Sequence, residues 1–286
     1  LFETVWSRLF VDSIQITAAE DLDVGRRAGY YDHYGAVRDV VQNHVLQILA
    51  LVTMDPPATF DAPDIRDAKT RLLRAVRPLD PNAAVRGQYE GYRDADGVPP
   101  DSRRETYAAA RVTIDNWRWQ GVPIFLRAGK ALRRSVTEAV VRFKEAPHLQ
   151  LDGRPVPGIP TLLAIRIQPH EEVQLRVGAK VPGARFELAP ASLHLDYRRL
   201  AHGPLPDAYE NVFAEVLEGG HSVFPGPDEI ERSWAIVDPL LRSWEERGSP
   251  APYSRGSWGP DEADALVAEH GGGRWMTSGE EPGMDP

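Results

Sequence analysis

The middle of the chain carries the pattern that most restricts its fold. Between residues 122 and 197, short segments of alternating or apolar residues are separated by turns rich in proline and glycine. Segments of this kind are typical of strands that join in an antiparallel meander. The strands are expected at residues 122–127, 138–143, 162–168, 172–177, 185–188 and 192–197.

Segments with helical periodicity lie on both sides of this run of strands. Apolar residues repeat at helical spacing over residues 36–53, where Asp55-Pro56-Pro57 ends the pattern. Further helices are expected at 64–76, 207–217, 228–246 and 260–269, a strand at 108–116 and a loop at 77–104. This order predicts an α+β fold with a large, mostly antiparallel sheet and helices on one face. The other face would need a cover, and a second copy of the chain in an isologous dimer is the natural one.

The two ends of the chain are expected to differ from this body. Apolar residues at helical spacing in 1–10, followed by a strand pattern up to residue 20, are interpreted as the last helix–strand unit of a missing Rossmann-like, dinucleotide-binding domain. An ordinary N-terminal helix is the alternative. With that domain absent, the apolar residues of 1–10 would be exposed. Residues 271–286 are expected to be a disordered tail, which leaves 21–270 as the main domain.

Composition narrows the classes of partner. The net charge of −9 gives no general attraction to nucleic acid or anionic lipid, so an anionic substrate would need a local basic pocket. There is no cysteine, and no apolar run approaches the roughly 20 residues of a membrane span. The histidines are scattered, without the spacing of metal ligands. We therefore expect a cytoplasmic protein with no metal and with neither a nucleic-acid nor a membrane partner.

A set of short motifs stands in a defined order along the chain. The most specific is R-A-G-Y-Y-D-H-Y-G-A-V-R-D-V-V-Q-N-H at 27–44. The others are V-P-I-F-L-R-A-G-K at 122–130, R-I-Q-P at 166–169, L-P-D-A-Y-E at 205–210 and G-S-W-G-P at 256–260. Together and in this order, they resemble the C-terminal, substrate-binding and dimerisation part of the glucose-6-phosphate dehydrogenase family. One such match would be weak, whereas the ordered set is specific.

The resemblance implies a reaction and a set of site residues. Family members oxidise glucose 6-phosphate at C1 to 6-phosphogluconolactone and transfer hydride to NADP. His44 resembles the base that removes the proton of the C1 hydroxyl, a role that suits an imidazole. Glu20, Asp39 and Gln168 resemble residues that hold sugar hydroxyls. Lys130, on a glycine turn after a strand, resembles a lysine that contacts the substrate.

These assignments have plainer alternatives. His44 falls in the apolar stripe of its predicted helix and could be a core histidine. Asp39 lies five residues earlier, about 140° round an α-helix, and so is a poor partner for His44. Asp39, Glu20 and Lys130 could instead be solvated surface charges.

The sequence also departs from the family pattern. The coenzyme loop G-x-x-G-D-L and the substrate loop D-H-Y-L-G-K are absent, and D-H-Y-G at 32–35 only imitates the second. The main NADP site is therefore expected outside this chain, and His33 is given no catalytic role. Ser135 stands five positions after Lys130, where many members have a second basic residue, although Arg133 and Arg134 adjoin it.

Three hypotheses follow for the chain. In the first, the chain is the substrate-binding half of an NADP-dependent dehydrogenase and is inactive alone. In the second, it is a non-catalytic module for sugar-phosphate binding or dimerisation. In the third, it is a dehydrogenase of another sugar phosphate. The expected partners are glucose 6-phosphate and further copies of the chain, as a homodimer or homotetramer through the sheet. Arg127 and Arg166 could stabilise the sheet or, as in some relatives, help to bind a second NADP.

Overall fold

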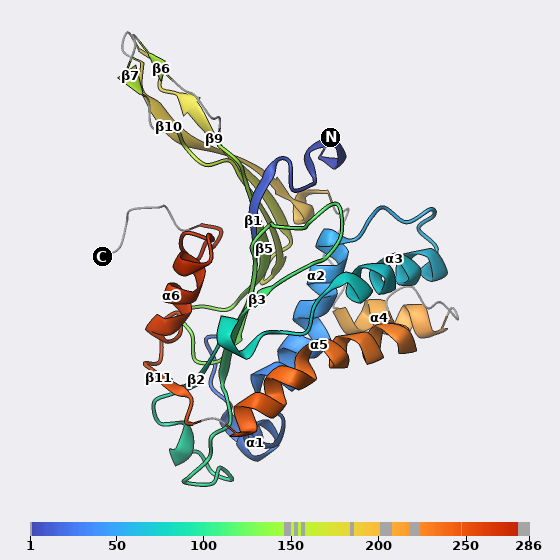
Figure 1. The fold of residues 1–286 in the computed structure, drawn as a ribbon, viewed down its shortest axis with the longest axis vertical. Coiled ribbons are helices and arrows are strands. Elements are labelled where there is room, and N and C mark those ends of the chain that lie inside the picture. Colours follow the sequence, from blue (N-terminus) through green and yellow to red (C-terminus); the bar gives the residue numbers. More distant parts are fainter. Residues whose placement is uncertain are drawn as a thin grey trace.

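A nine-stranded sheet forms the body of the molecule (Figure 1). The computed structural model describes residues 2–145, 150–151, 154–155, 158–183, 186–200, 208–217, 224–246 and 248–279. The strands of the large sheet are β1 (Val11–Ala19), β2 (Ala84–Tyr89), β3 (Tyr107–Val112), β4 (Ile124–Gly129), β5 (Val136–Phe143), β8 (Leu162–Gln168), β9 (Glu172–Lys180), β10 (Leu188–Asp196) and β11 (Ala251–Tyr253). Two short strands, β6 (Gln150–Leu151) and β7 (Arg154–Pro155), pair separately.

The strand order is β10-β9-β8-β5-β1-β4-β3-β2-β11. Only the β1–β4 and β2–β11 pairs are parallel among the pairs of the described strands. The predicted α+β class with a mostly antiparallel sheet is therefore confirmed. The expected loop at 77–104 was wrong in part, since it contains β2. The segment expected at 192–197 falls on β10 up to residue 196, whereas only residue 188 of the segment expected at 185–188 belongs to that strand, and residue 185 lies outside the described part of the chain.

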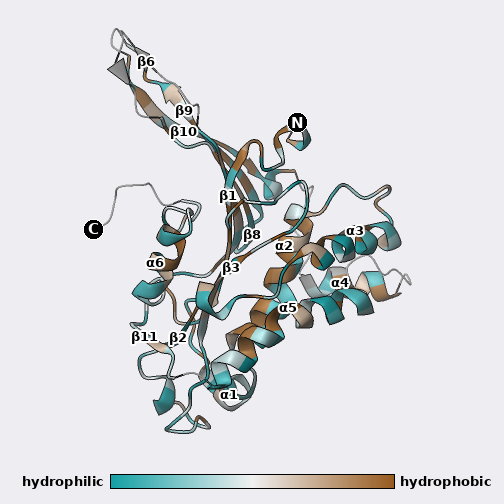
Figure 2. Cartoon of the chain, viewed as in Figure 1, coloured by the Kyte–Doolittle hydropathy of each residue, from teal (hydrophilic) through white to brown (hydrophobic). Residues whose placement is uncertain are grey.

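Helices cover both faces of the sheet, which corrects the prediction of helices on one face. The helices are α1 (Ala28–Ala36), a π-helix (Val37–Val45), α2 (Leu46–Thr53), α3 (Ala62–Ala75), α4 (Ala208–Leu217), α5 (Pro227–Glu246) and α6 (Asp261–Glu269). In Figure 1, α1 to α5 lie on one side of the sheet and α6 lies on the other. Figure 2 shows hydrophobic residues along α2 and along the strands beside it, where the core lies.

Strand β1 near the start of the chain belongs to the same sheet as the later strands, although residues 1–20 were expected to be part of another domain. β1 lies inside the sheet, between β4 and β5. The helix expected at 1–10 is only one 3-10 turn, Glu3–Val5. Phe2, Val5 and Trp6 pack against the core, so the expected exposed patch shrinks to Leu9 and Phe10. Residue 1 lies outside the described part.

The segment from Gly271 to Gly279 packs against the sheet, whereas a disordered tail was expected to begin at residue 271. The side-chain amide of Gln15 on β1 donates to the carbonyls of Gly272 and Arg274. The backbone N–H of Ser278 donates to the buried carboxylate of Glu138 on β5, at 3.0 Å. These bonds satisfy polar groups inside the sheet that would otherwise be buried without partners. Residues 280–286 lie outside the described part.

Candidate active site

Two charged side chains meet at one end of the sheet because β1 and β4 run parallel. Ala19 and Gly129 are register partners, so the residues that follow them, Glu20 and Lys130, leave the sheet side by side. The Lys130 Nζ lies 2.6 Å from Glu20 Oε2. The lysine side chain is 12% exposed and the glutamate 45%, so this ion pair opens to solvent on the carboxylate side.

Gln168 lies at the same end of the sheet. It pairs with Thr137 on β5, and Thr137 pairs with Ala18 on β1. Paired residues point to one face of a sheet, as do residues two apart on a strand. Gln168 therefore lies on the same face as Glu20, two strands along, or about 10 Å away by strand spacing. The structure leaves this side chain exposed.

The helix that follows α1 is a π-helix over its first nine residues, Val37–Val45. Its last turn is closed by an i→i−5 bond from the N–H of Leu46 to the carbonyl of Val41. Such helices are rare and occur mainly as single turns at functional sites. Residues 41–42 and 45–46 are buried, whereas 43–44 are exposed, so this stretch has one buried and one exposed side.

The π-helix corrects the predicted angle between Asp39 and His44. The value of about 140° holds for an α-helix, whereas i→i+5 bonding places residues five apart one turn above each other. Asp39 and His44 therefore share the outward side of the helix. His44 is exposed, which excludes the alternative of a core histidine. The hydroxyl of Tyr30 donates to Asp39 Oδ1 at 3.5 Å.

Gly35 and Glu105 fix the start of the π-helix. Gly35 breaks the helical path with φ 74° and ψ 172°. The carbonyl of Glu105 accepts from the N–H of Ala36, and its carboxylate accepts from the N–H of Val37 at 3.3 Å. Burial raises the pKa of Glu105 above its usual value, against the opposing effect of Arg104. This carboxylate is thus a buried cap for helix donors that lack partners within the helix.

Two tyrosines, Tyr31 and Tyr253, contact Lys130, and the sequence analysis assigned neither of them a role. The ammonium lies 5.3 Å from the ring centroid of Tyr31. The hydroxyl of Tyr253 donates to the carbonyl of Lys130 at 2.7 Å, and the N–H of Lys130 donates to the carbonyl of Thr106. Tyr31 stands within the 27–44 motif, which was the available signal, whereas Tyr253 comes from the remote strand β11.

The departure at Ser135 also has a structural counterpart. The Ser135 hydroxyl donates to the carboxylate of Asp21 and accepts from its backbone N–H at 3.0 Å. Arg134 turns away, since its guanidinium donates to the carbonyl of Ser278 at 2.5 Å. Arg133 is exposed, so of the two arginines it is the one left near the Lys130 turn. Ser135 is therefore paired with the acid Asp21 at this end of the sheet.

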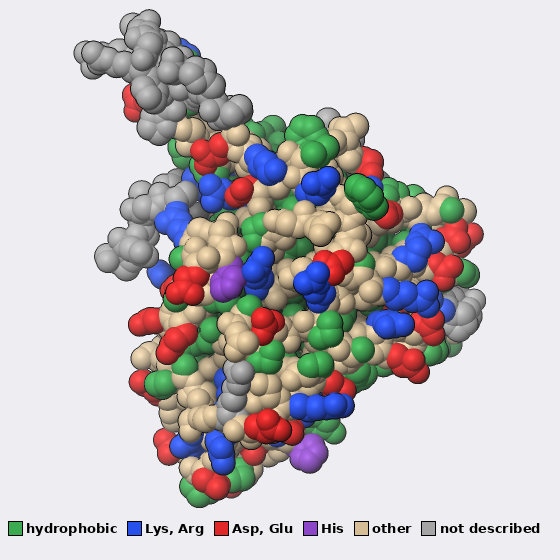
Figure 3. Space-filling view, viewed as in Figure 1, with side chains coloured by type: hydrophobic (Ala, Val, Ile, Leu, Met, Phe, Trp, Pro, Cys, Tyr) green, Lys and Arg blue, Asp and Glu red, His purple; other side chains and the backbone are tan. Residues whose placement is uncertain are grey.

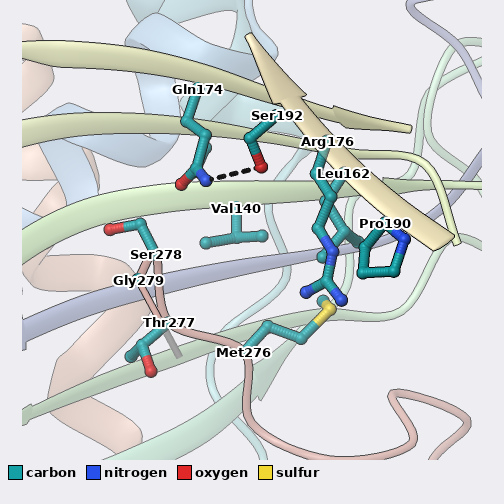
Figure 4. A pocket seen from close by; sticks show the side chains of 11 residues that line it. Val140, Leu162, Gln174, Arg176, Pro190, Ser192, Met276, Thr277, Ser278 and Gly279 are labelled. Carbon is teal, nitrogen blue, oxygen red and sulfur yellow. Dashed lines mark hydrogen bonds between the residues drawn. The ribbon is translucent and has the colours of Figure 1, made fainter. Parts of the chain in front are cut away.

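A separate cavity of about 220 Å³ lies between strands β8–β10 and the segment Met276–Gly279 (Figure 4). Arg176, Gln174 and Ser192 line it, and none of the predicted site residues does. Of the predicted residues, Glu20 and Lys130 are in direct contact, and Glu20 and His44 both reach solvent. Arg127 lies behind the sheet end, its guanidinium 4.5 Å from the ring centroids of both Trp258 and Trp275.

The surface charge, the arrangement of possible metal ligands and the apolar character of the helices each bear on whether the chain can bind an anion, a metal ion or a membrane. On the face shown in Figure 3, basic and acidic side chains are interspersed. Within the described residues, no group of three or more histidine, aspartate or glutamate side chains is arranged to hold a metal ion. Among the helices of this same part, none is long and apolar enough to cross a membrane.

The fold and the charged cluster at the sheet end define an α+β domain with a polar site beside a π-helix. Residues 1–276 match the model of the glucose-6-phosphate dehydrogenase C-terminal domain. The chain therefore belongs to the glucose-6-phosphate dehydrogenase family.

Named relatives and solved structures agree with this membership. The chain is 41% identical to glucose-6-phosphate 1-dehydrogenase 2 of Mycobacterium tuberculosis, over 95% of this chain and 55% of the relative. A crystal structure of the enzyme from Mycobacterium avium matches with a TM-score of 0.84 and 41% identity, over 96% of this chain and 58% of that one. A glucose-6-phosphate dehydrogenase in complex with glucose 6-phosphate matches with a TM-score of 0.86 and 36% identity, with the same coverage of each. The chain thus spans little more than half the length of these relatives.

Proposed function

We propose that this chain is the substrate-binding part of an NADP-dependent glucose-6-phosphate dehydrogenase. The observation that carries the proposal is the meeting of Lys130 with Glu20 at the sheet end, where the π-helix packs against β4 and β1. In this assignment Lys130 binds the phosphorylated sugar, and Glu20, Asp39 and Gln168 accept or donate hydrogen bonds to its hydroxyls. An ammonium on a glycine turn and carboxylates nearby are suited to a phosphate ester with several hydroxyls.

His44 is the proposed base. It is exposed and neutral imidazole has a free acceptor nitrogen, so it can take the proton of the C1 hydroxyl as the C1–H bond gives up its hydride. The products are the lactone, the protonated imidazole and the reduced acceptor. Asp39, on the same side of the π-helix, would fix a neighbouring sugar hydroxyl and thereby the position of C1 relative to His44.

The proposed hydride acceptor is NADP, which supplies the nicotinamide ring. After β1, where a dinucleotide-binding fold has a glycine-rich turn into a helix, this chain has Glu20 and the 3-10 turn Gly25–Arg27. This turn lacks the glycine-rich form that cradles a pyrophosphate, which supports a sugar-phosphate site at this end of the sheet. The proposal assigns the main NADP site to a domain outside this chain, so the chain alone should be inactive. No metal takes part in this scheme.

The proposed domain and assembly follow from the sheet. The domain includes β1 and extends through the packed segment that ends at Gly279. Leu193 and Leu195 on β10 are exposed apolar residues, which supports self-association through this part of the sheet as a homodimer or homotetramer. Light scattering decides this, since a single monomer mass at all concentrations would contradict it. The cytoplasmic location is proposed from family membership alone.

Calorimetry with glucose 6-phosphate tests the substrate assignment on this chain. Lys130→Ala should weaken binding by about 10- to 100-fold, because it removes a charged hydrogen-bond donor. His44→Ala should bind within about threefold of the unchanged chain, since a base contributes mainly in the transition state. Equal binding by Lys130→Ala and the unchanged chain would place the phosphate elsewhere.

A different sugar phosphate is the second candidate, favoured by the Asp21–Ser135 pair at the mouth of the site. Ser135→Lys adds a cation where many family members have one. If glucose 6-phosphate is the substrate, this variant should bind it a few-fold more tightly than the unchanged chain does. Its affinity for inorganic phosphate should rise by a similar factor. Weaker binding of glucose 6-phosphate together with tighter binding of inorganic phosphate would favour another sugar.

A further inference from the structure

Tyr31 is a buried side chain of the hydrophobic core that also contacts Lys130, a member of the charged pair at the sheet end. It is only 2% exposed and lies on α1, one turn before the start of the π-helix. Its ring centroid is 5.3 Å from the Lys130 ammonium. The acids that act on its hydroxyl electrostatically include Glu105, Asp39 and Glu20. Burial raises the pKa of Tyr31 well above its usual value, and Tyr253 and then these acids add to the effect, so the phenol stays neutral.

The hydroxyl of Tyr31 does not explain why a tyrosine is buried here. It has no accessible surface and no hydrogen-bond partner within the described residues. A buried donor without an acceptor destabilises a protein. The ring is therefore the part of this side chain that has stabilising contacts: it is buried in the hydrophobic core, and the Lys130 ammonium lies over its face.

The surroundings of Lys130 show what the ring does. Glu20 contacts the ammonium on one side, and the Tyr31 ring faces it on another. An aromatic face attracts a cation without using one of its hydrogen-bond donors. The ammonium has three donors, so those not directed at Glu20 stay available to an anion.

We propose that Tyr31 is a positioning residue, whose ring holds the Lys130 ammonium in place for the phosphate of the substrate. This role rests on the proposed function for the identity of the ligand, but not for the contact itself. Tyr31 acts through Lys130 and does not touch the ligand. Because only the ring is needed, phenylalanine should serve equally well, and the hydroxyl should be dispensable.

Two variants separate the ring from the hydroxyl. Tyr31→Phe keeps the ring and removes the unpartnered hydroxyl, and Tyr31→Leu removes both while keeping an apolar side chain. We expect Tyr31→Phe to bind glucose 6-phosphate and inorganic phosphate as the unchanged chain does, with equal or higher thermal stability. Tyr31→Leu should bind both about 5- to 30-fold more weakly, the range of a partly desolvated cation–π contact.

A spectroscopic measurement tests the contact without any ligand. In the unchanged chain and in Tyr31→Phe, ring currents should shift the Lys130 side-chain methylene resonances upfield, and Tyr31→Leu should abolish the shift. The shift would show the contact between Tyr31 and Lys130 even if neither ligand bound. If the shift were present and neither ligand bound, the proposed function would be contradicted, but the contact would not. Absence of the shift in the unchanged chain, or full phosphate binding by a folded Tyr31→Leu, would overturn the role of Tyr31. So would a Tyr31→Phe variant as weak as Tyr31→Leu.

Discussion

Replacing Lys69 by methionine is expected to lower the free energy of unfolding by about 3–5 kcal/mol. Lys69 on α3 lies 2.8 Å from the carboxylate of Glu229 on α5, and the two side chains are 7% and 0% exposed. The same ammonium donates to Gln47 at 3.0 Å. Lys69 and Glu229 form an ion pair, but Glu229 Oε2 accepts no hydrogen bond within the described residues. Methionine would leave Glu229 as a buried charge without its counter-ion, which is the costly case.

An exposed ion pair between the same two helices provides the matched control. Arg74 and Asp228 lie 3.4 Å apart with side chains that are 55% and 70% exposed. Arg74→Met should change stability by less than about 1 kcal/mol. Urea denaturation measures both variants. The double variant Lys69→Met with Glu229→Gln should recover part of the loss, since the amide still accepts from the N–H of Gly226. Equal small losses in Lys69→Met and Arg74→Met would show that Glu229 is not a buried charge in solution.

Replacing Gly35 by alanine is expected to destabilise the chain by about 3 kcal/mol or more and to weaken substrate binding. Gly35 has φ 74°, a conformation that alanine adopts only at a cost. A Cβ atom there would lie 2.3 Å from the carboxylate of Glu105, which caps the π-helix. Relief of this clash displaces the Glu105 carboxylate from the N–H of Val37, which uncaps the start of the helix that carries Asp39 and His44.

Gly121→Ala separates the backbone cost from the clash. Gly121 has φ 87°, and a Cβ atom there would meet nothing within 4 Å. It should therefore show only the cost of the positive φ, about 1–2 kcal/mol, with unchanged binding. Denaturation and glucose 6-phosphate calorimetry on both variants give the comparison. If Gly35→Ala lost no more stability than Gly121→Ala and bound sugar phosphate normally, the Glu105 cap would not control the site.

Much of the fold could be predicted because its signals are local. The strand β8 and the helices α3 and α5 were expected within a few residues of their observed bounds, since apolar periodicity decides such elements. The short strand β11 was missed because three residues around Pro252 carry too little pattern. The first ten residues were mistaken for a helix because their apolar spacing reflects packing against the core by a single turn. The segment at 271–279 was mistaken for a tail because its partners, Gln15 and Glu138, are remote in sequence.

The sequence by itself determined the family and which residue types gather at the site, because ordered motifs and residue chemistry are read along the chain. Only the tertiary structure decided their geometry. The parallel pairing of β1 with β4 brings Glu20 to Lys130 across more than a hundred residues. The π-helix turns Asp39 and His44 to one side, which an α-helical projection forbids. Both arrangements depend on long-range contacts, such as the Glu105 cap, whose free energy no local sequence pattern encodes.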